Sequence, residues 1–559
     1  MTREPGFPTR AERLTALESR QFDVLIIGGG ITGAAAARDA AARGLSVALL
    51  EREDWASGTS WRSSKLIHGG LRYLETADVR LVFESLSERA RLIRLAPHLV
   101  EPLDFLFPSY RARGIAPWLR ELGLTAYDLL ALGRSPSWHR RLSKEELLRR
   151  ERLLESPELL SGAVYSDART DDARLTLENV LDAVLLSAVA VSRVEVAALE
   201  KDASGKIRGV RARDRESGRL LSVAASVVIN ATGAWGDQVL RLDAREAPPQ
   251  LRLSRGVHLT FPASRLPLQS IVAFPMEDGR LLFGIPYGPV TLLGTTDTDY
   301  AGSPDEVSAD VQDVRYLLDA ASRTFPSARL SETDVLSTFA GLRPLVREPG
   351  KSLEETSREE ALTVSASGLV SVTGGKLTTH RRMGAKAIDR AARLLRRQGR
   401  AVPASATSSR RFPGAPDMPM KEFLPFFAGL ATSINRSLRE ETAHHLARRY
   451  GSRASEIVAL TAEDRELGRP LSPGLPDIDA EVVFASRRED ARTLTDVLIR
   501  RTHLFWQAPR QGLEAVERAA ALLGRELRWS KAQESAAMDD YAREVERSRR
   551  ALRETALSF

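Results

Sequence analysis

The sequence predicts an α/β protein with an antiparallel β region and a C-terminal α-helical domain. Residues 22–50 alternate an apolar strand, a glycine turn, an Ala-rich helix and a second strand, which is the pattern of a parallel βαβ unit. Residues 251–296 contain short β-rich runs separated by Pro and Gly, which favour antiparallel strands. Residues 421–559 have a helical pattern, with helices predicted over 440–450, 455–460, 489–502, 513–527 and 531–552.

The first predicted unit contains a turn suited to a dinucleotide. Gly28, Gly30 and Gly33 have G-x-G-x-x-G spacing, which allows a tight turn, close approach to a pyrophosphate and close packing of helix on strand. The second strand, residues 47–50, ends at Glu51, where an acid accepts ribose hydroxyls and favours FAD or NAD over NADP. The alternative is an ordinary structural turn between a strand and a helix.

The following elements divide the chain into domains. Residues 97–160, rich in Pro, Trp and Leu, are expected to form an insertion that covers the core. A helix is predicted over 175–192, strands over 194–199, 207–213 and 223–229, a small-residue turn over 230–235, a helix over 310–325, a strand over 368–373 and a helix over 382–398. We expect a leader over 1–20, one domain over 21–96, 161–245 and 340–400 interleaved with a second over 97–160 and 246–339, a linker over 401–420, and a helical domain over 421–559.

Composition limits the functional classes. The chain has 559 residues, 43% hydrophobic and 28% charged, which is typical of a globular protein. It contains no cysteine, so disulfides and cysteine-ligated metals are excluded, any redox chemistry belongs to a bound cofactor, and we predict no metal site. The apolar stretch 180–194 is interrupted by Asp182 and Arg193 and is too short to span a bilayer.

Charge and the N-terminal segment give further limits. The net charge of +7 comes from cations interleaved with acids, with no basic cluster containing aromatics, which argues against nucleic-acid binding. Residues 1–20 lack an apolar signal core, which argues against secretion.

Two further groups of residues suggest an anionic ligand. Residues 57–75 combine hydroxyls, glycines and cations that suit phosphate oxygens and the flat face of a ring. His258, Arg343, Arg358 and Lys376 are cations in apolar or glycine-rich surroundings. Each alone is more typical of a surface charge, but together they suit a phosphate monoester, whose oxygens match guanidinium groups.

On these motifs the chain resembles the FAD-dependent, quinone-linked (aerobic) glycerol-3-phosphate dehydrogenases. The resemblance runs in order from about residue 20 to 395 and continues into the helical C-terminus. It is carried by residues 27–33, 64–74 (Ser-Lys-Leu-Ile-His-Gly-Gly-Leu-Arg-Tyr-Leu), 230–233, 294–297, 343–345, 374–379 (Gly-Gly-Lys-Leu-Thr-Thr), 493–498 and 500–502.

The resemblance implies a glutathione-reductase-like FAD-binding Rossmann domain with an antiparallel β substrate domain and a C-terminal α-helical domain. It implies that FAD is held non-covalently by Gly28, Gly29, Gly30, Ile31, Thr32, Gly33, Glu51, Arg52, Thr59, Ser60, Ser63, Ser64, Lys65, Leu66, His68, Gly69, Gly70, Ala231, Thr232, Gly233, Trp235, Gly375, Lys376, Leu377 and Thr378. It places Arg72, Tyr73, His258, Arg343, Arg358 and Lys376 in contact with the substrate.

The implied reaction removes the C2 hydroxyl proton of glycerol 3-phosphate and transfers the C2 hydride to flavin N5, giving dihydroxyacetone phosphate. Arg343 and Lys376 are expected to stabilise the developing alkoxide, with His258 as the base. Arg72 and Arg358 are expected to bind the phosphate.

The sequence departs from the family pattern in three places. Trp61 replaces a small residue, so we expect the adjacent loop to pack differently. Glu359 and Glu360 follow Arg358 where an acid and then an aromatic or His is expected, which weakens the assignment of Arg358. The residues before Gln21 have no functional interpretation.

Several alternatives remain open at this point. A glycerol-3-phosphate oxidase would share nearly all these residues and pass electrons to O2, giving H2O2, although the oxidases carry an additional insertion that we do not find. A 2-hydroxy- or amino-acid oxidase fits the cations less well, and a flavin-binding protein without turnover is a third class. The resemblance implies a cytoplasmic protein peripherally attached to the inner face of the membrane, where quinone is reduced; a homodimer is left open.

Overall fold

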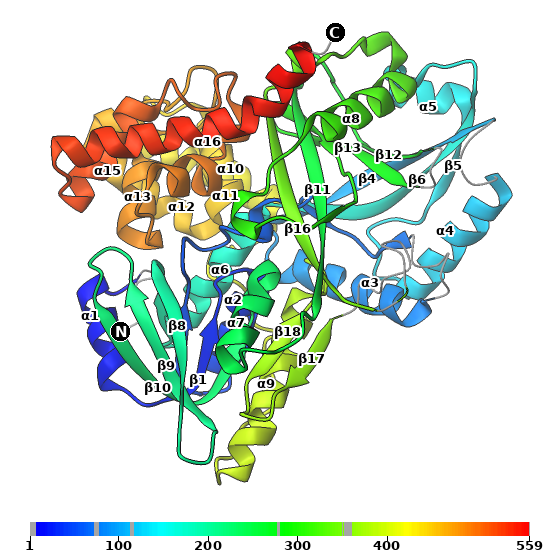
Figure 1. Ribbon diagram of the computed structural model, residues 1–559. Helices are drawn as coiled ribbons and strands as arrows, with labels where there is room; N and C mark the ends of the chain where they lie inside the picture. Colours follow the sequence, from blue (N-terminus) through cyan, green and yellow to red (C-terminus); the bar gives the residue numbers. More distant parts are fainter. Residues whose placement is uncertain are drawn as a thin grey trace.

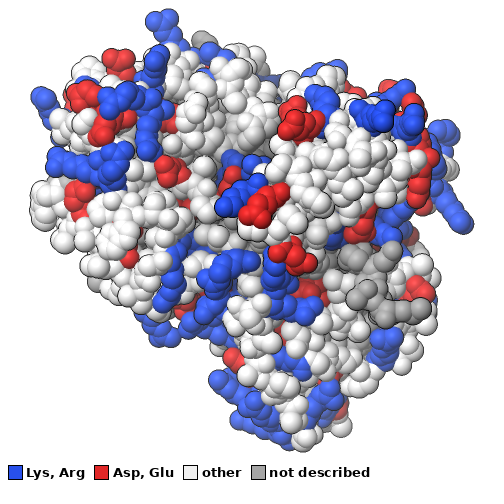
Figure 2. All heavy atoms as spheres, turned by 180° about the vertical axis from the view of Figure 1, so that it is seen from behind, with Lys and Arg blue, Asp and Glu red and all other residues white. Residues whose placement is uncertain are grey.

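The computed structural model describes residues 7–71, 78–111, 117–276, 280–348, 350 and 360–557. Figure 1 shows two sheets side by side, with the C-terminal helices packed against both. Within the described part of the chain, every helix is too short or too polar to cross a bilayer. On the face drawn in Figure 2, Lys and Arg are interleaved with acids and form no continuous basic patch.

The first sheet is parallel at its centre and holds the predicted glycine turn. Its strand order is β17-β18-β10-β1-β2-β7, and an antiparallel ribbon of β8 and β9 extends β10. The bounds are β1 Phe22–Ile27, β2 Val47–Leu50, β7 Val189–Val191, β8 Val194–Lys201, β9 Ile207–Asp214, β10 Leu220–Asn230, β17 Ala361–Val364 and β18 Val370–Thr373. Every residue of β1 and β2 is buried, as central parallel strands require.

Helices cover both faces of this sheet. On one face pack α2 (Ile31–Ala42), α6 (Asp172–Leu185) and α9 (His380–Arg397), and Gly384 lets α9 lie directly against the backbone of α2. The other face is covered by the β8–β9 ribbon, α1 (Arg10–Ser19) and α7 (Gly236–Asp243). The predicted leader therefore contains an ordered helix, and Arg13 holds it through a buried ion pair of 2.5 Å with Asp490.

The second sheet is mixed and mostly antiparallel. Its order is β15-β11-β14-β13-β12-β4-β6-β3, with β16 also paired to β11 and β5 to β6. The bounds are β3 Leu66–Ile67, β4 Val100–Tyr110, β5 Arg140–Ser143, β6 Leu159–Thr170, β11 Leu251–Pro262, β12 Ile271–Pro275, β13 Leu281–Tyr287, β14 Val290–Gly294, β15 Thr298–Tyr300 and β16 Ser337–Val346. Helix α8 (Val311–Thr324) packs its apolar side on this sheet, while α3 (Val79–Leu95), α4 (Pro117–Ala131) and α5 (Lys144–Arg150) lie at its far end (Figure 1).

Sheet membership differs from the expected segment bounds at three strands, and the first is β3, which pairs with β6 although we assigned residues 66–67 to the first domain. Strands β6 and β16 belong to the second sheet because β6 pairs with β4 and β16 with β11, although we assigned residues 161–170 and 340–346 to the first domain. Strand β4 lies between β12 and β6, so residues 97–160 supply an inner strand rather than only a cover.

The C-terminal domain is helical in its described residues. Its helices are α10 Met420–Ile434, α11 Glu440–Tyr450, α12 Ala454–Glu463, α13 Asp479–Glu489, a π-helix Asp496–Arg501, α14 Leu504–Gln507, α15 Val516–Leu527 and α16 Lys531–Leu557. The single helix expected over 489–502 is instead interrupted, because Asp490 adopts a left-handed conformation (φ 59°) that ends α13. Helix α16 leaves this domain and packs on α8 and β16 of the second sheet.

Candidate functional site

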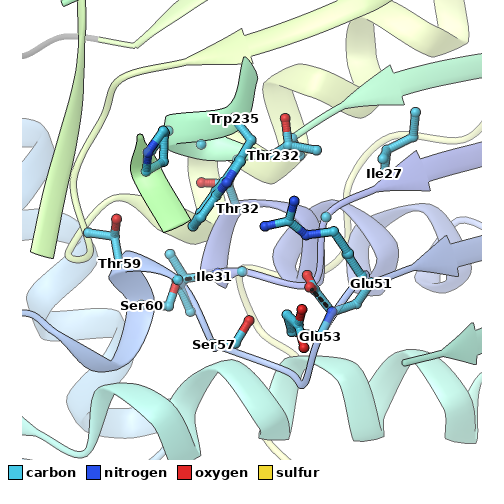
Figure 3. A pocket seen from close by; sticks show the side chains of 18 of the residues that line it. Ile27, Ile31, Thr32, Glu51, Glu53, Ser57, Thr59, Ser60, Thr232 and Trp235 are labelled. Carbon is cyan, nitrogen blue, oxygen red and sulfur yellow. Dashed lines mark hydrogen bonds between the residues drawn. The ribbon is translucent and has the colours of Figure 1, made fainter. Parts of the chain in front are cut away.

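A cleft of about 1010 Å³ opens where the parallel strands end. The strands β1, β2, β10 and β18 run parallel, so Gly28, Glu51, Ala231 and Gly374 meet at one edge of the sheet. Ligands of open α/β sheets bind at this edge. Figure 3 shows side chains from these segments around the pocket, and its volume is at the upper end of the range for ligand pockets.

The glycine turn is packed too closely for any side chain. Gly28 has φ +107°, and a Cβ atom there would lie 2.7 Å from the carbonyl oxygen of Ala231. A Cβ on Gly33 would lie 1.9 Å from the Gly28 oxygen. Helix α2 begins directly after Gly30, so its first N–H groups face the cleft, as phosphate binding requires. The predicted turn therefore forms with the geometry of a pyrophosphate site.

Glu51 lies at the end of β2, as predicted. Its carboxylate accepts hydrogen bonds from the backbone N–H groups of Gly29 (2.6 Å) and Glu53 (2.7 Å). Burial raises the pKa of Glu51, and these two hydrogen bonds oppose that shift. The carboxylate is thus fixed at the cleft wall, where it can accept hydrogen bonds from ribose hydroxyls.

The loop after Glu51 forms a second wall of the cleft, and three of its predicted cofactor residues also bind other parts of the protein. Ser60 Oγ accepts the N–H of Ile31 at 2.9 Å and so braces the start of α2. Ser63 and Lys65 both bind Asp172, and the Lys65 Nζ–Asp172 distance is 2.7 Å with both groups buried. The Lys65 ammonium therefore stabilises the loop from behind and does not reach the cleft.

Trp61, which differs from the small residue of the family pattern, packs against two other parts of the chain. Its buried ring packs between Phe339 of β16 (5.5 Å between centroids) and Phe505 of α14 (6.1 Å). Its Nε1 donates to the Ser57 carbonyl at 3.2 Å. The large side chain thus anchors the loop to β16 and to the C-terminal domain, and a packing different from that of the family stays a prediction.

The predicted segments 64–70 and 374–379 contact each other. The N–H of His68 donates to Thr378 Oγ1 (3.2 Å), and the Thr378 hydroxyl donates to the His68 carbonyl (3.1 Å). The N–H of Gly69 donates to the Tyr127 hydroxyl at 2.8 Å. Gly375 (φ +87°) leads to Lys376, which lines the cleft. Residues 374–377 line the cleft, and residues 64–70 pack against this segment through His68.

Arg343 on β16 and His258 on β11 lie on neighbouring strands of the second sheet. The Arg343 guanidinium donates to Thr295 Oγ1 (3.2 Å), the Thr296 carbonyl (3.2 Å) and Asp297 Oδ1 (3.0 Å). This side chain is 25% exposed, and the next residue, Pro344, lines the cleft. Gly256 leaves room for the guanidinium, because a Cβ there would lie 2.6 Å from Nη2.

His258 is buried beside Arg343 and stacks on Phe339 with 4.9 Å between ring centroids. Its Nε2 hydrogen-bonds Ser64 Oγ at 2.9 Å, which links the FAD-side loop to the second sheet. Burial, together with the charges of Arg343 and Lys65, lowers the pKa of His258 to about 3. The imidazole is therefore neutral, and a weak rather than a well-matched base.

Sixteen of the predicted cofactor residues line the cleft: Gly28, Gly30, Ile31, Thr32, Glu51, Arg52, Thr59, Ser60, Ser63, Ala231, Thr232, Gly233, Trp235, Gly375, Lys376 and Leu377. The other predicted cofactor residues that the structure describes do not line the cleft: Gly29, Gly33, Ser64, Lys65, Leu66, His68, Gly69, Gly70 and Thr378. Arg72, Tyr73 and Arg358 lie outside the described residues. Glu360 forms an ion pair with Lys386 of α9.

The sequence reasoning missed residues that reach the cleft from other domains. Arg500 of the π-helix and Arg547 of α16 line it from the C-terminal domain, and Asp305 lines it from the second sheet's domain. Arg500 is held by Asp54 (2.6 Å), which follows the predicted Glu51. The Arg500-Arg501 motif was available as a signal, but its target lies more than 400 residues away.

One group has the spacing of metal ligands among the described residues. His445, Asp477 and Glu481 place their ligand atoms within 4.8 Å of one another. Arg449 Nη1 lies 2.5 Å from Asp477 and 3.3 Å from Glu481. A guanidinium thus already neutralises the carboxylates, and we assign no metal there.

The cleft satisfies the requirements of FAD. A pyrophosphate needs glycines and a helix N-terminus, which residues 28–33 supply, and an adenosine ribose needs the carboxylate at Glu51. A flavin ring needs a further, closely bordered compartment, which residues 57–63, 344 and 374–377 border.

Comparisons with known proteins agree with this geometry. A family described as FAD dependent oxidoreductase matches residues 23–390, and one described as C-terminal domain of alpha-glycerophosphate oxidase matches residues 405–534. The chain is 36% identical over 491 residues to the aerobic glycerol-3-phosphate dehydrogenase of Staphylococcus haemolyticus, covering 87% of each chain. It is 36% identical over 535 residues to the glycerol-3-phosphate dehydrogenase of Synechocystis sp., covering 92% of this chain and 95% of the relative.

Two solved structures are similar to this chain, one over nearly its whole length. The glycerol-3-phosphate dehydrogenase from Bacillus halodurans complexed with FAD has a TM-score of 0.81 and 30% identity, over 96% of this chain and 97% of that one. The L-alpha-glycerophosphate oxidase from Mycoplasma pneumoniae, with FAD bound, has a TM-score of 0.53 and 20% identity over 70% of this chain and 98% of that one, which shows a shared fold.

Proposed function

Because the chain belongs to the FAD-dependent oxidoreductases and, within them, to the glycerol-3-phosphate dehydrogenases, we propose that it oxidises sn-glycerol 3-phosphate to dihydroxyacetone phosphate with bound FAD. The bound flavin would supply the hydride acceptor. The chain itself binds and orients both molecules and handles the proton of the C2 hydroxyl.

The observation that carries the proposal is the fixed guanidinium of Arg343 beside the cleft. Four protein oxygens, from Ser254, Thr295, Thr296 and Asp297, hold it in place, so it is preorganised to stabilise negative charge on the C2 oxygen. Lys376 lines the cleft from the opposite loop and adds a second positive charge. Cations at this position also favour an anionic substrate over a neutral alcohol.

His258 is the proposed acceptor of the hydroxyl proton. It is neutral, the charge of Arg343 acts on it, and its Nδ1 has no hydrogen-bond partner among the described residues. Because its pKa of about 3 makes it a weak base, the proton transfer depends on Arg343 and Lys376 lowering the pKa of the substrate hydroxyl. Arg72, Tyr73 and Arg358 remain proposed substrate contacts from the resemblance alone.

The test is reduction of the bound flavin without oxygen. We expect sn-glycerol 3-phosphate to bleach the flavin absorbance, and glycerol at the same concentration to leave it oxidised. Bleaching eliminates a flavin-binding protein without turnover. A flavin that stays oxidised with FAD bound and the phosphorylated substrate present refutes the proposal.

We further propose a quinone as the electron acceptor, on the resemblance and on the dehydrogenase names of the relatives. The alternative is an oxidase, a name carried by the C-terminal family. The two are separated by measuring H2O2 during aerobic turnover against reduction of a short-chain quinone. Stoichiometric H2O2 with no quinone reduction establishes the oxidase.

An exposed apolar stripe on α4 supports attachment to a lipid surface. Trp118, Leu122, Leu129 and Leu132 recur at helical spacing on its solvent side and are 58% to 70% exposed. Trp138 follows at 61%, and such aromatic rings favour the membrane interface. Figure 1 shows α4 at the edge of the molecule, away from the C-terminal helices.

Cations beside this stripe favour anionic lipid. Arg140 and Arg141 are exposed directly after Trp138. We therefore propose that α4 is the membrane-facing surface. A W118S/L122S/L129S variant is expected to lose sedimentation with phosphatidylglycerol vesicles, whereas F426S, which removes a 56% exposed aromatic from α10, is expected to retain it. Equal binding of both variants contradicts the proposal. A homodimer stays a prediction, to be measured by light scattering.

A further inference from the structure

A side-chain bridge crosses the cofactor cleft at Asp305. This residue lies on a single 3₁₀ turn, Pro304–Glu306, in the connection between β15 and α8 of the second domain. Its Oδ1 accepts from Arg52 Nη2 at 2.5 Å and from Trp235 Nε1 at 3.0 Å. Arg52 follows β2 and Trp235 follows β10, so the two donors come from two walls of the first sheet's cleft.

The bridge has contacts on each side that fix it over the cleft. The Arg52 guanidinium also lies 5.3 Å from the Trp235 ring centroid, in a cation–π contact. The Trp235 ring rests on Gly58, where a Cβ would lie 3.0 Å from it, and Figure 3 shows the ring projecting toward the segment of Ser57. From the C-terminal domain, Arg547 Nη1 donates to the Asp305 carbonyl at 3.4 Å.

The exposed fractions of the Asp305 and Arg52 side chains indicate how much their ion pair contributes to stability. Arg52, Trp235, Asp305 and Arg547 all line the cleft. The Asp305 side chain is 50% exposed and that of Arg52 is 27% exposed. An exposed ion pair contributes little to folding. Its position matters more, because separating these residues widens the cleft between domains while leaving the cores of both sheets intact.

We propose that Asp305 is a cofactor-retention residue. By joining Arg52 and Trp235 it forms a strap across the cleft, and opening of this strap limits the rate at which FAD leaves. The strap acts on FAD binding and not on the chemical step. This inference rests on the proposed FAD site but goes beyond the reaction.

The experiment measures FAD release from the holoenzyme by the rise of flavin fluorescence after dilution. We expect Asp305→Asn, which keeps an acceptor for Trp235 but loses the ion pair, to release FAD about three- to fivefold faster, the range expected for one exposed ion pair. Asp305→Ala, which loses both contacts, is expected to release it faster still. Trp235→Phe, which keeps the ring but loses the N–H, is expected to lie between wild type and Asp305→Ala.

A salt series and a matched control separate retention from a general effect. Raising NaCl to about 0.5 M is expected to speed release from wild type by a larger factor than release from Asp305→Asn, because the substitution has already removed the ion pair that salt screens. The control Asp299→Asn breaks a comparable exposed pair with Arg252, on β15, outside the cleft lining, and is expected to release FAD at the wild-type rate. The apoprotein Tm is expected to be equal in all of these except Trp235→Phe.

Two results would overturn the inference. One is release from both Asp305 variants at the wild-type rate. The other is an equal fall of the apoprotein Tm and of FAD retention, which would indicate a purely structural role. Failure of the proposed function is distinguishable, because it appears as a flavin that sn-glycerol 3-phosphate does not reduce in any variant, whatever the release rate.

Discussion

Arg343→Ala is the substitution for which the structure gives the clearest magnitude. The guanidinium is held by Thr295, Thr296 and Asp297 and is only a quarter exposed. A unit charge about 4 Å from a developing alkoxide, at an effective dielectric constant of about 20, contributes about 4 kcal/mol. Since about 1.4 kcal/mol is a tenfold change in rate, the variant should reduce its flavin about 10³-fold more slowly.

Arg343→Lys separates the charge from the geometry. Lysine keeps the positive charge but loses the planar guanidinium that donates to four oxygens, so we expect an intermediate loss of about 10- to 100-fold. Arg252→Ala is the matched control, because Arg252 lies on β11 and forms an exposed ion pair with Asp299. We expect it to reduce flavin at nearly the wild-type rate.

The assay is stopped-flow mixing of FAD-loaded protein with sn-glycerol 3-phosphate under anaerobic conditions, at saturating substrate. Flavin content is measured for each variant first, so that loss of cofactor is not counted as loss of rate. If Arg343→Ala reduces its flavin within threefold of wild type, Arg343 does not stabilise the alkoxide and the assignment is wrong.

Three further predictions follow from the same site. Gly33→Ala places a Cβ 1.9 Å from the Gly28 oxygen, so it should destabilise the turn by about 1–3 kcal/mol and lower the flavin-to-protein ratio. The control Gly429→Ala adds a Cβ with nothing within 4 Å and should leave the ratio unchanged. Equal ratios in the two variants would contradict the turn geometry. Because the pKa of His258 is about 3, its imidazole is uncharged from pH 6 to pH 8. His258→Asn should therefore slow flavin reduction by the same factor at pH 6 and at pH 8. A factor that changes between these pH values would show that the histidine titrates in this range. Lys65→Met leaves Asp172 buried without its cation and should lower the free energy of unfolding by about 3–5 kcal/mol, measured by thermal unfolding. The double variant Lys65→Met/Asp172→Asn should partly reverse this loss. An unchanged Tm in Lys65→Met would contradict the structural role of Lys65 and favour its assignment to the cofactor.

The parts of the site predicted from sequence are those whose physics is local. The turn at Gly28–Gly33 and the acid at Glu51 are set by residues within one βαβ unit, so spacing alone identifies them. Segments 64–70 and 374–379 came from the resemblance, and the structure brings them together through His68 and Thr378.

The rest depends on pairing between distant residues. The resemblance assigned Lys65 to the cofactor, and its buried partner in the structure, Asp172, lies 107 positions away and cannot be identified from spacing. Strands β6 and β16 lie in a different sheet from the one expected, because they pair with β4 and β11 of the second sheet. Arg500, Arg547 and Asp305 reach the cleft only through packing of one domain on another.

The measurement that tests the central claim most directly is an anaerobic titration of the FAD-loaded protein with sn-glycerol 3-phosphate, followed by flavin absorbance and by assay of the product. We predict that one equivalent of dihydroxyacetone phosphate forms for each flavin reduced, and that deuterium at C2 slows the reduction. A flavin that remains oxidised, or that is reduced without formation of dihydroxyacetone phosphate, would contradict the account.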